Sequence, residues 1–72
     1  MESLVVETIS RLSDIKLSKI SLTSSFVDLE IDSLDLAELV IELENELEIK
    51  IDNYIYQTKT VGELIEHIKK IK

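Results

Sequence analysis

The chain has no proline and only one glycine, Gly62, among its 72 residues. Proline and glycine are the residues that most often break helices and form tight turns, so their near absence favours a helical fold with few turns. A domain of this length buries only about 60% of the surface that its unfolded chain exposes. We therefore expect residues 1–72 to form a single small domain with a thin core and no deep cleft.

Apolar residues recur at helical spacing in three stretches, which predict helices over residues 3–13, from Asp32 to about Leu47, and from Thr60 onward. The last of these begins with a T-x-x-E capping box, and Asp32 with Asp35 three residues later gives a capping-box-like pair at the start of the second. Residues 52–57 predict a short helical turn, and residues 16–31 lose the helical period and predict a long loop. The expected fold class is all-α: a small four-helix bundle with a long loop after helix 1 and a short third helix.

Acidic residues are concentrated in the middle of the chain. No lysine or arginine occurs between Lys19 and Lys50, whereas nine of the 15 acidic residues do, which leaves six acidic and all eight basic residues elsewhere. The net charge of −7 argues against nucleic acid and anionic membranes as partners. The acidic segment is either a solvated helix face or a docking surface for basic partners.

Several kinds of site are disfavoured by the residues present. The chain has no cysteine, and its one histidine, His67, does not build a metal site by itself. Ser33 has no histidine or lysine near it in the sequence to serve as a base, so we expect no enzyme activity and place His67 on the surface. Residues from Asp28 onward imitate the start of an EF-hand, but the sixth position is Ser33 and the twelfth is Leu39. We predict no metal site.

The sequence shows no sign of membrane insertion or export. No apolar run approaches the roughly 20 residues that span a bilayer. The first residues, Met1-Glu2-Ser3, lack the basic region of a signal peptide. We therefore expect a cytoplasmic protein, and the sequence is equally compatible with a stand-alone chain and with an excised domain.

The predicted second helix has two apolar faces. At about 100° per residue, one arc of roughly 100° holds the expected core residues, which are Leu36, Leu39, Val40, Leu43 and Leu47. Leu34 and Ile41 fall on the opposite side, beside Glu38. Two exposed aliphatic side chains among carboxylates predict a docking patch for a basic partner. Self-association through this face is the alternative, but it would bring like charges together, so we expect a monomer.

The run Asp32-Ser33-Leu34-Asp35 at the start of this helix resembles the D-S-L motif of acyl and peptidyl carrier proteins. The resemblance extends over nearly the whole chain, through Ser25-Phe26-Val27-Asp28-Leu29 before the motif, Glu38-Leu39-Val40 and Leu43-Glu44 after it, and Thr60-Val61 at the last helix. It implies that a phosphopantetheinyl transferase attaches 4'-phosphopantetheine to Ser33, between Asp32 and Leu34. The arm would carry acyl groups as thioesters to acyl-loading and acyl-chain-processing enzymes.

The same resemblance implies further roles for residues of the second helix. Asp35, Glu38, Ile41 and Glu44 would meet the basic docking surfaces of partner enzymes, which agrees with the patch found from the helical period. In the fatty-acid branch of the family the cargo folds back between helices. Candidates to line such a pocket are Phe26, Ile31, Leu36, Leu43 and Ile65, and plain core packing is the alternative that we favour for them.

The chain departs from the family pattern at some positions. Glu30-Ile31 stands where a glycine often precedes the D-S-L motif, the segment before the motif is one residue short, and Ile51-Asp52 lacks a frequent proline. Tyr54-Ile55-Tyr56 is bulky for a segment that is often acidic. Fatty-acid biosynthesis is the leading expectation, with polyketide or nonribosomal peptide assembly as the alternative. A function of another class is an acidic helical adaptor that has no prosthetic group and is phosphorylated at Ser33.

Overall fold

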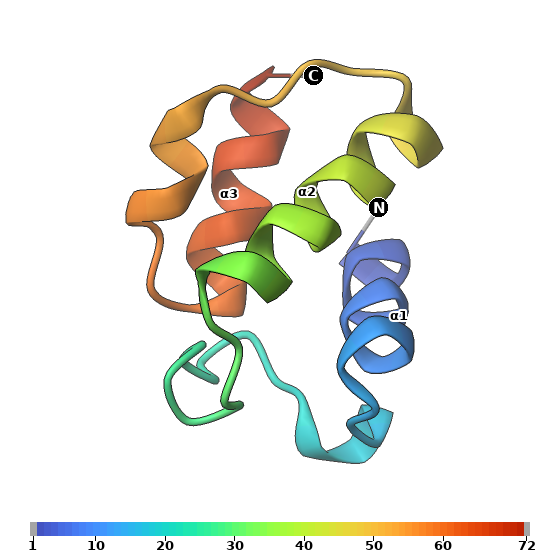
Figure 1. Cartoon of the computed structure of the whole chain (residues 1–72), viewed down its shortest axis with the longest axis vertical. Coiled ribbons are helices and arrows are strands. Elements are labelled where there is room, and N and C mark those ends of the chain that lie inside the picture. Colours follow the sequence, from blue (N-terminus) through green and yellow to red (C-terminus); the bar gives the residue numbers. More distant parts are fainter. Residues whose placement is uncertain (1, 72) are drawn as a thin grey trace.

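A computed structural model describes residues 2–71 of the chain, and these residues form an all-helical fold (Figure 1). Its elements in chain order are α1 (Glu2–Ser13), the 3₁₀ helix η1 (Leu17–Lys19), α2 (Ser33–Leu47), the 3₁₀ helix η2 (Asn53–Gln57) and α3 (Val61–Ile71). The all-α fold class is therefore confirmed. The four-helix count is not, because the described residues contain three α-helices and the short third helical segment is η2.

The 3₁₀ geometry of η2 follows from its length and its ends. Asp52 caps the start by accepting a hydrogen bond from the N–H of Tyr54 at 3.1 Å. Thr58 closes the end, since its backbone N–H and its hydroxyl both donate to the carbonyl of Ile55. Only Ile55 is buried within the element. Five residues with one inward side chain form the short i→i+3 turn, which does not extend into an α-helix.

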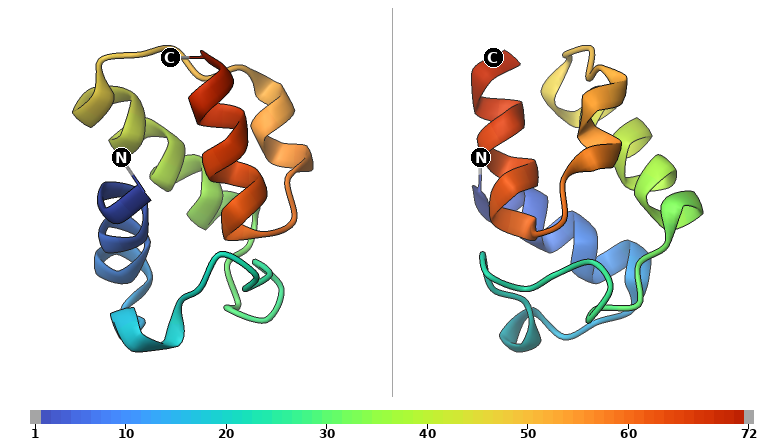
Figure 2. Two further views of the ribbon diagram at one scale, coloured as in Figure 1. Left: turned by 180° about the vertical axis from the view of Figure 1, so that it is seen from behind. Right: turned by 90° about the vertical axis from the view of Figure 1, so that its left-hand side faces the viewer.

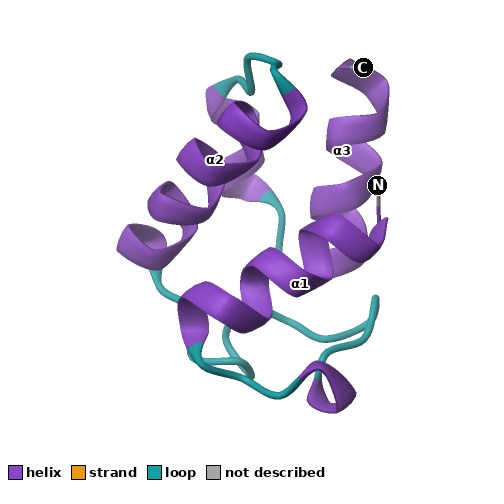
Figure 3. Cartoon of the chain, turned by 90° about the vertical axis from the view of Figure 1, so that its right-hand side faces the viewer, coloured by secondary structure: helices purple, strands orange, loops and turns teal. Residues whose placement is uncertain are grey.

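The core is apolar and draws on every α-helix. α1 packs against both α2 and α3, as the view in Figure 3 shows. The stripe predicted for α2 supplies Leu36, Leu39, Val40 and Leu43, while Leu47 is only partly buried at its edge. The other buried apolar residues are Val5, Ile9, Ile20, Phe26, Ile31, Ile51, Ile55, Val61, Leu64, Ile65 and Ile68.

The segment between α1 and α2 is fixed to the start of α3 rather than loose. The N–H of Phe26 donates to the carbonyl of Lys59 at 2.9 Å, and the N–H of Val61 donates to the carbonyl of Ser24 at 3.0 Å. The N–H of Gly62 donates to the carbonyl of Leu22 at 2.8 Å. The first N–H groups of a helix have no acceptor within the helix. Here the loop supplies these acceptors, which holds the chain that leads into α2.

The capping box predicted for α3 is only half formed. The hydroxyl of Thr60 accepts from the N–H of Glu63 at 3.1 Å, as the T-x-x-E pattern predicts. The carboxylate of Glu63 accepts from the N–H of Lys59 at 2.8 Å instead of from Thr60. Thr60 is paired with Ser25 in an isolated antiparallel bridge, which turns its backbone toward the loop.

No helix within residues 2–71 is both long enough and apolar enough to cross a membrane.

Candidate functional site

The site predicted from the D-S-L motif lies at the first turn of α2. Asp32 is the N-cap, and its carboxylate accepts from the N–H of Asp35 at 2.9 Å. The carboxylate of Asp35 in turn accepts from the N–H of Asp32 at 3.3 Å. This reciprocal pair forms the capping box that the sequence predicted. It fixes the start of α2 and makes Ser33 the first helical residue.

Ser33 is exposed, and its position suits the attachment of an anionic group. The backbone N–H groups of Ser33 and Leu34 belong to the first turn, where the helix has no acceptors for them and its dipole favours negative charge. The nearby carboxylates of Asp32 and Asp35 would oppose a phosphodiester. Each of them already accepts a backbone N–H, which offsets part of their charge. An open surface around the hydroxyl and free donors beside it fit a phosphopantetheine arm.

The two apolar side chains predicted on the outside of α2 are exposed there. Leu34 has 75% of its surface exposed and Ile41 has 57%. Glu38 is exposed as well, and Ala37 is half-buried beside them. The structure therefore leaves Leu34, Glu38 and Ile41 exposed together on the side of α2 opposite its buried stripe, and Ser33 exposed at the first turn. We call Leu34, Asp35, Glu38 and Ile41 the docking face.

The two flanks of α2 face different neighbours. Glu42 lies on one flank and forms an exposed ion pair with Arg11 of α1, with 3.5 Å between nitrogen and oxygen. Glu44 lies on the other flank, where its carboxylate accepts from the N–H of Ile51 at 2.8 Å. Sequence reasoning placed Glu44 among the docking residues and missed this bond. The bond depends on the tertiary fold. Glu48 ends α2 in a left-handed conformation with φ of 54°, and residues 48–51 then turn back so that Ile51 reaches Glu44.

Val27 belongs to the family pattern but was not predicted as a site residue, and the structure places it in the open. It is strongly exposed in the turn that leads to the D-S-L motif. This turn is closed by a hydrogen bond from the N–H of Ile31 to the carbonyl of Phe26 at 2.8 Å. No signal in the sequence marked it, because the same loop carries other apolar residues, such as Phe26 and Ile31, that are buried in the core.

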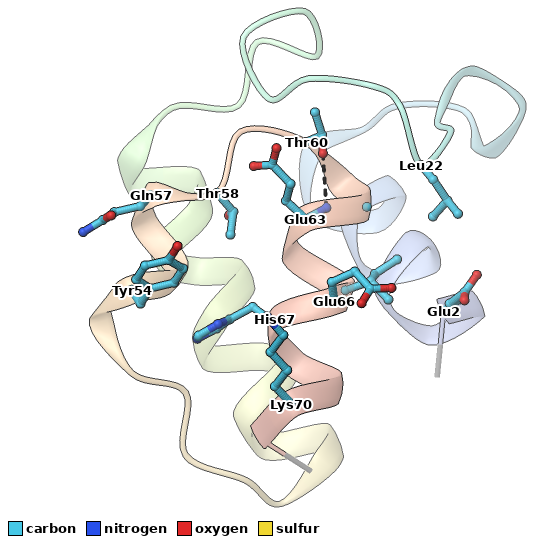
Figure 4. Close-up of a pocket in the computed structure, with 12 residues that line it drawn as sticks. Glu2, Leu22, Tyr54, Gln57, Thr58, Thr60, Glu63, Glu66, His67 and Lys70 are labelled. Carbon is cyan, nitrogen blue, oxygen red and sulfur yellow. Dashed lines mark hydrogen bonds between the residues drawn. The ribbon is translucent and has the colours of Figure 1, made fainter.

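The five residues considered for a cargo pocket all belong to the core. Phe26, Ile31, Leu36, Leu43 and Ile65 are each buried and lie in one apolar cluster. This arrangement agrees with core packing, the alternative favoured from the sequence. Ile65 also borders a shallow hollow of about 450 Å³ on the outer side of α3, which Figure 4 shows with its lining side chains.

His67 lines the surface hollow beside α3, as a surface residue would, but it is less exposed than predicted. Only 15% of its side chain is exposed, and its Nε2 lies 2.8 Å from Oδ1 of Asp52. Its ring packs on the ring of Tyr54, with 5.0 Å between the centroids (Figure 4). The contact joins α3 to η2. The helical period could show that His67 lies near the core stripe, but not that η2 would cover it.

Comparisons with known proteins agree with this geometry. Residues 3–68 match the family described as "Phosphopantetheine attachment site". The chain is 46% identical to the acyl carrier protein of Clostridium perfringens over 52 residues, which cover 69% of this chain and 68% of that protein. It is 34% identical to the meromycolate extension acyl carrier protein of Mycobacterium leprae over 70 residues, which cover 94% of this chain and 61% of that protein.

The fold has a solved counterpart. A chain from Mycobacterium tuberculosis, described as a putative acyl carrier protein, aligns with a TM-score of 0.84 and 34% sequence identity. The alignment covers 96% of this chain and 95% of that chain. The likeness therefore includes the loop before α2 and the short segment before α3, and is not limited to the long helices.

Proposed function

Because this chain belongs to the acyl carrier protein family, we propose that Ser33 is the residue that carries the family's prosthetic group, 4'-phosphopantetheine. Members of this family are carriers and not catalysts. When bound, the arm supplies a terminal thiol that holds an acyl group as a thioester. The chain would then hold acyl intermediates and deliver them to partner enzymes. The observation that carries the proposal is the exposed Ser33 hydroxyl at the first turn of α2.

The residues around Ser33 have separate roles in this proposal. The hydroxyl of Ser33 accepts the arm from coenzyme A in the active site of a phosphopantetheinyl transferase. The free N–H groups of Ser33 and Leu34 favour the negative charge of the new phosphodiester. Asp32 and Asp35 hold the helix start through their capping box and present carboxylates to basic residues of the transferase.

Partner enzymes would dock on the outer side of α2. The docking face combines two exposed aliphatic side chains, Leu34 and Ile41, with the carboxylates of Asp35 and Glu38. Apolar contact provides affinity, and opposite charges guide the approach of a basic surface. Glu44 remains a candidate at the edge of this face, with its bond to Ile51 as a second role. The carrier would act as a monomer, because pairing two such faces would bring their carboxylates together.

We place the carrier in fatty-acid biosynthesis in the cytoplasm, as a single domain over residues 1–72. The concentration of acidic residues on α2 favours a discrete carrier that separate enzymes recognise. Polyketide or nonribosomal peptide assembly is the alternative use, favoured by the bulky Tyr54-Ile55-Tyr56 segment and by Glu30 in place of glycine. The alternative of another class is an acidic adaptor that is phosphorylated at Ser33 and carries no arm.

One experiment tests the attachment site and separates these classes. The full chain and the Ser33→Ala variant are incubated with coenzyme A and a broad-specificity phosphopantetheinyl transferase, and their intact masses are measured. We expect one added arm on the parent chain and none on the variant. A folded parent chain that gains no mass, while the same transferase modifies another carrier, would overturn the proposal and favour the adaptor.

A further inference from the structure

Two exposed leucines lie in a part of the chain that the proposed function does not use. Leu17 is 51% exposed and Leu22 is 46% exposed, and both belong to the segment between α1 and α2. A single exposed aliphatic residue is common on a protein surface, whereas an apolar patch indicates a surface that binds a partner. The meaning of the two leucines therefore depends on whether their side chains lie together.

Leu17 and Leu22 line the same hollow, between α1 and the segment that follows it. The hollow has a volume of about 350 Å³. Val6 of α1, which packs on the core, and Ile20, which belongs to the core, line it as well. Figure 3 shows η1 below α1, and the two elements are in contact. The structure therefore gathers these apolar side chains into one concave surface.

This hollow meets the hollow on the outer side of α3, because Glu2 and Leu22 line both. Figure 4 shows these two residues at one edge of the α3 hollow and Tyr54 at the other. In the left-hand view of Figure 2, α1 and α3 stand side by side with the chain after η1 below them, and α2 lies behind α3. We call the joined surface, from Leu17 through Leu22 to Tyr54, the α1–α3 groove. Its lining residues come from elements other than α2, so it is separate from the docking face.

The backbone around both leucines is held in place. The N–H of Ile20 donates to the carbonyl of Leu17 at 3.1 Å, which closes η1. The carbonyl of Leu22 accepts from the N–H of Gly62 at 2.8 Å, which fixes this residue to the start of α3. A surface that is ordered before binding loses less conformational entropy when a partner docks. The groove is therefore ready to receive a partner without rearrangement of its backbone.

Carboxylates predominate among the charged groups that line the groove. The acidic residues are Glu2, Glu7, Glu63 and Glu66, and the lysine among the lining residues is Lys70. Glu2 forms an ion pair with Lys69 at 3.1 Å, which offsets one of the negative charges. Lys16 and Lys19 stand on either side of Leu17 in the chain, but they do not line the hollow. An apolar surface with carboxylates at its rim favours a partner that is both apolar and basic.

The shape of the groove decides between a second copy of this chain and another protein. In a symmetric dimer the same surface patch meets itself. Two α1–α3 grooves placed face to face would leave both concavities unfilled and would bring their carboxylates together. A helix is convex, and an amphipathic helix fills an apolar groove with residues at i, i+3, i+4 and i+7. Lysine or arginine residues beside that apolar stripe would meet the carboxylates at the rim.

We propose that the α1–α3 groove binds a basic amphipathic helix of a partner protein while α2 stays free. The inference goes beyond the proposed function, because it assigns a partner to a side of the carrier that includes neither Ser33 nor the docking face. The apolar stripe of the helix covers Leu17 and Leu22, and its basic residues face Glu7 and Glu66. A protein bound there holds the carrier without covering α2, so the enzymes that act on Ser33 still reach it.

A synthetic peptide tests the groove on the parent chain. The peptide is helical, with leucines at i, i+3, i+4 and i+7 and lysines on both sides of them, and a control peptide has glutamates in place of the lysines. Backbone amide resonances of the ¹⁵N-labelled chain are followed while each peptide is added, in about 0.15 M salt to screen non-specific attraction. We expect the lysine peptide to shift the amides of Leu17, Leu22 and Glu66 and to leave those of Leu34 and Ile41 in place. The glutamate peptide should shift neither group.

Two matched variants compare the groove with the docking face. Leu22→Ser removes an exposed leucine from the groove, and Leu34→Ser makes the same replacement on α2. We expect the dissociation constant of the lysine peptide to rise about 5-fold for Leu22→Ser and to change by less than about 2-fold for Leu34→Ser. Leu17→Ser should weaken binding in the same direction as Leu22→Ser. Thermal unfolding followed by circular dichroism checks that each variant is folded.

The transferase assay then tests whether the two surfaces work independently. With the lysine peptide at saturation, kcat/KM for modification of Ser33 should stay within about 2-fold of its value without peptide. Loss of modification would overturn the inference, as would shifts on α2 in place of the groove, equal binding of the two peptides or equal losses for Leu22→Ser and Leu34→Ser. A parent chain that sediments as a dimer, and as a monomer after Leu22→Ser, would overturn it by assigning the groove to a second copy. A chain that is never modified at Ser33, with or without peptide, would overturn the proposed function and leave the peptide measurements as they stand.

Discussion

The carboxylate of Glu44 accepts a hydrogen bond from the backbone N–H of Ile51 at 2.8 Å. This bond links the second half of α2 to the segment that enters η2, and Glu44 is half-buried where it forms. Hydrogen bonds to a charged group contribute about 1.5–3 kcal/mol, more than those between neutral groups. Glu44 therefore has a role in stability that is distinct from the docking role expected from the family resemblance.

Replacing Glu44 separates these two roles. We expect Glu44→Lys to lower the free energy of unfolding by about 1.5–3 kcal/mol, because the N–H of Ile51 loses its acceptor. Glu44→Gln keeps a side-chain oxygen and should lose less. Glu38→Lys, on the exposed side of the same helix, should stay within about 0.5 kcal/mol of the parent. Urea denaturation measures all three, and equal stability of Glu44→Lys and Glu38→Lys would show that the bond to Ile51 does not stabilise the fold.

A substitution at Glu38 tests the docking face without removing a hydrogen bond that stabilises the fold. Reversing its charge should lower kcat/KM for modification by the transferase, by about 5-fold at low salt if one surface charge pair is lost. The difference from the parent should shrink as salt is added, because the screening length falls to about 8 Å at roughly 0.15 M. An assay over a range of salt concentrations measures both effects. A Glu38→Lys variant that is modified as fast as the parent at low salt would argue against the acidic side of α2 as the docking surface.

Gly62 is predicted to tolerate no side chain, although it lies in a helix. A Cβ atom at this position would be 2.8 Å from the backbone carbonyl oxygen of Leu22, which also accepts the N–H of Gly62. Glycine to alanine usually stabilises a helix by up to about 1 kcal/mol. Here we expect Gly62→Ala to destabilise by about 1–3 kcal/mol, because the loop must move and lengthen its bond to α3. Glu66→Ala, on the exposed side of α3, is the control and should be near neutral; a more stable Gly62→Ala variant would contradict the close approach.

Glu30 has a backbone conformation that suits glycine. Its φ is 59°, in the left-handed region, and it occupies the position before the D-S-L motif where the family often has glycine. This conformation costs a residue with a Cβ about 1–2 kcal/mol. We expect Glu30→Gly to raise the stability, by up to about 1 kcal/mol after the greater freedom of glycine in the unfolded chain is subtracted. Glu38→Gly makes the same replacement inside α2 and should lower the stability by about 1 kcal/mol. A loss of stability in both variants would show that Glu30 is not strained.

Local patterns predicted much of this architecture. The apolar period of α2 placed Leu34 and Ile41 on the outside, and the spacing of Asp32 and Asp35 predicted their capping box. These features depend on residues at close spacing within one helix, whose geometry is fixed. Because α2 buries a single face, the side chains on the opposite side, such as Leu34 and Ile41, are exposed.

Features that depend on two distant segments could not be predicted in this way. The helical period indicates the face on which His67 lies, but only the fold brings Asp52 and Tyr54 over it. In the same way, the partner of Glu44 is a backbone N–H seven residues away, across a turn with a left-handed residue. A periodic pattern assigns a residue to a face and does not identify what covers that face.

Substitutions at Asp32 test separately whether this residue caps α2 and whether the transferase recognises its charge. Its carboxylate accepts the N–H of Asp35, and its charge is one residue from the proposed attachment site. We expect Asp32→Ala to lose about 0.5–2 kcal/mol of stability, and Asp32→Asn to lose much less, because asparagine caps a helix about as well as aspartate. If the charge of Asp32 is recognised by the transferase, Asp32→Asn should still slow modification of Ser33, by about 5-fold for one lost charge pair. Urea denaturation and the transferase assay together give both values. A stable Asp32→Asn variant that is modified at the parental rate would leave Asp32 as a helix cap alone.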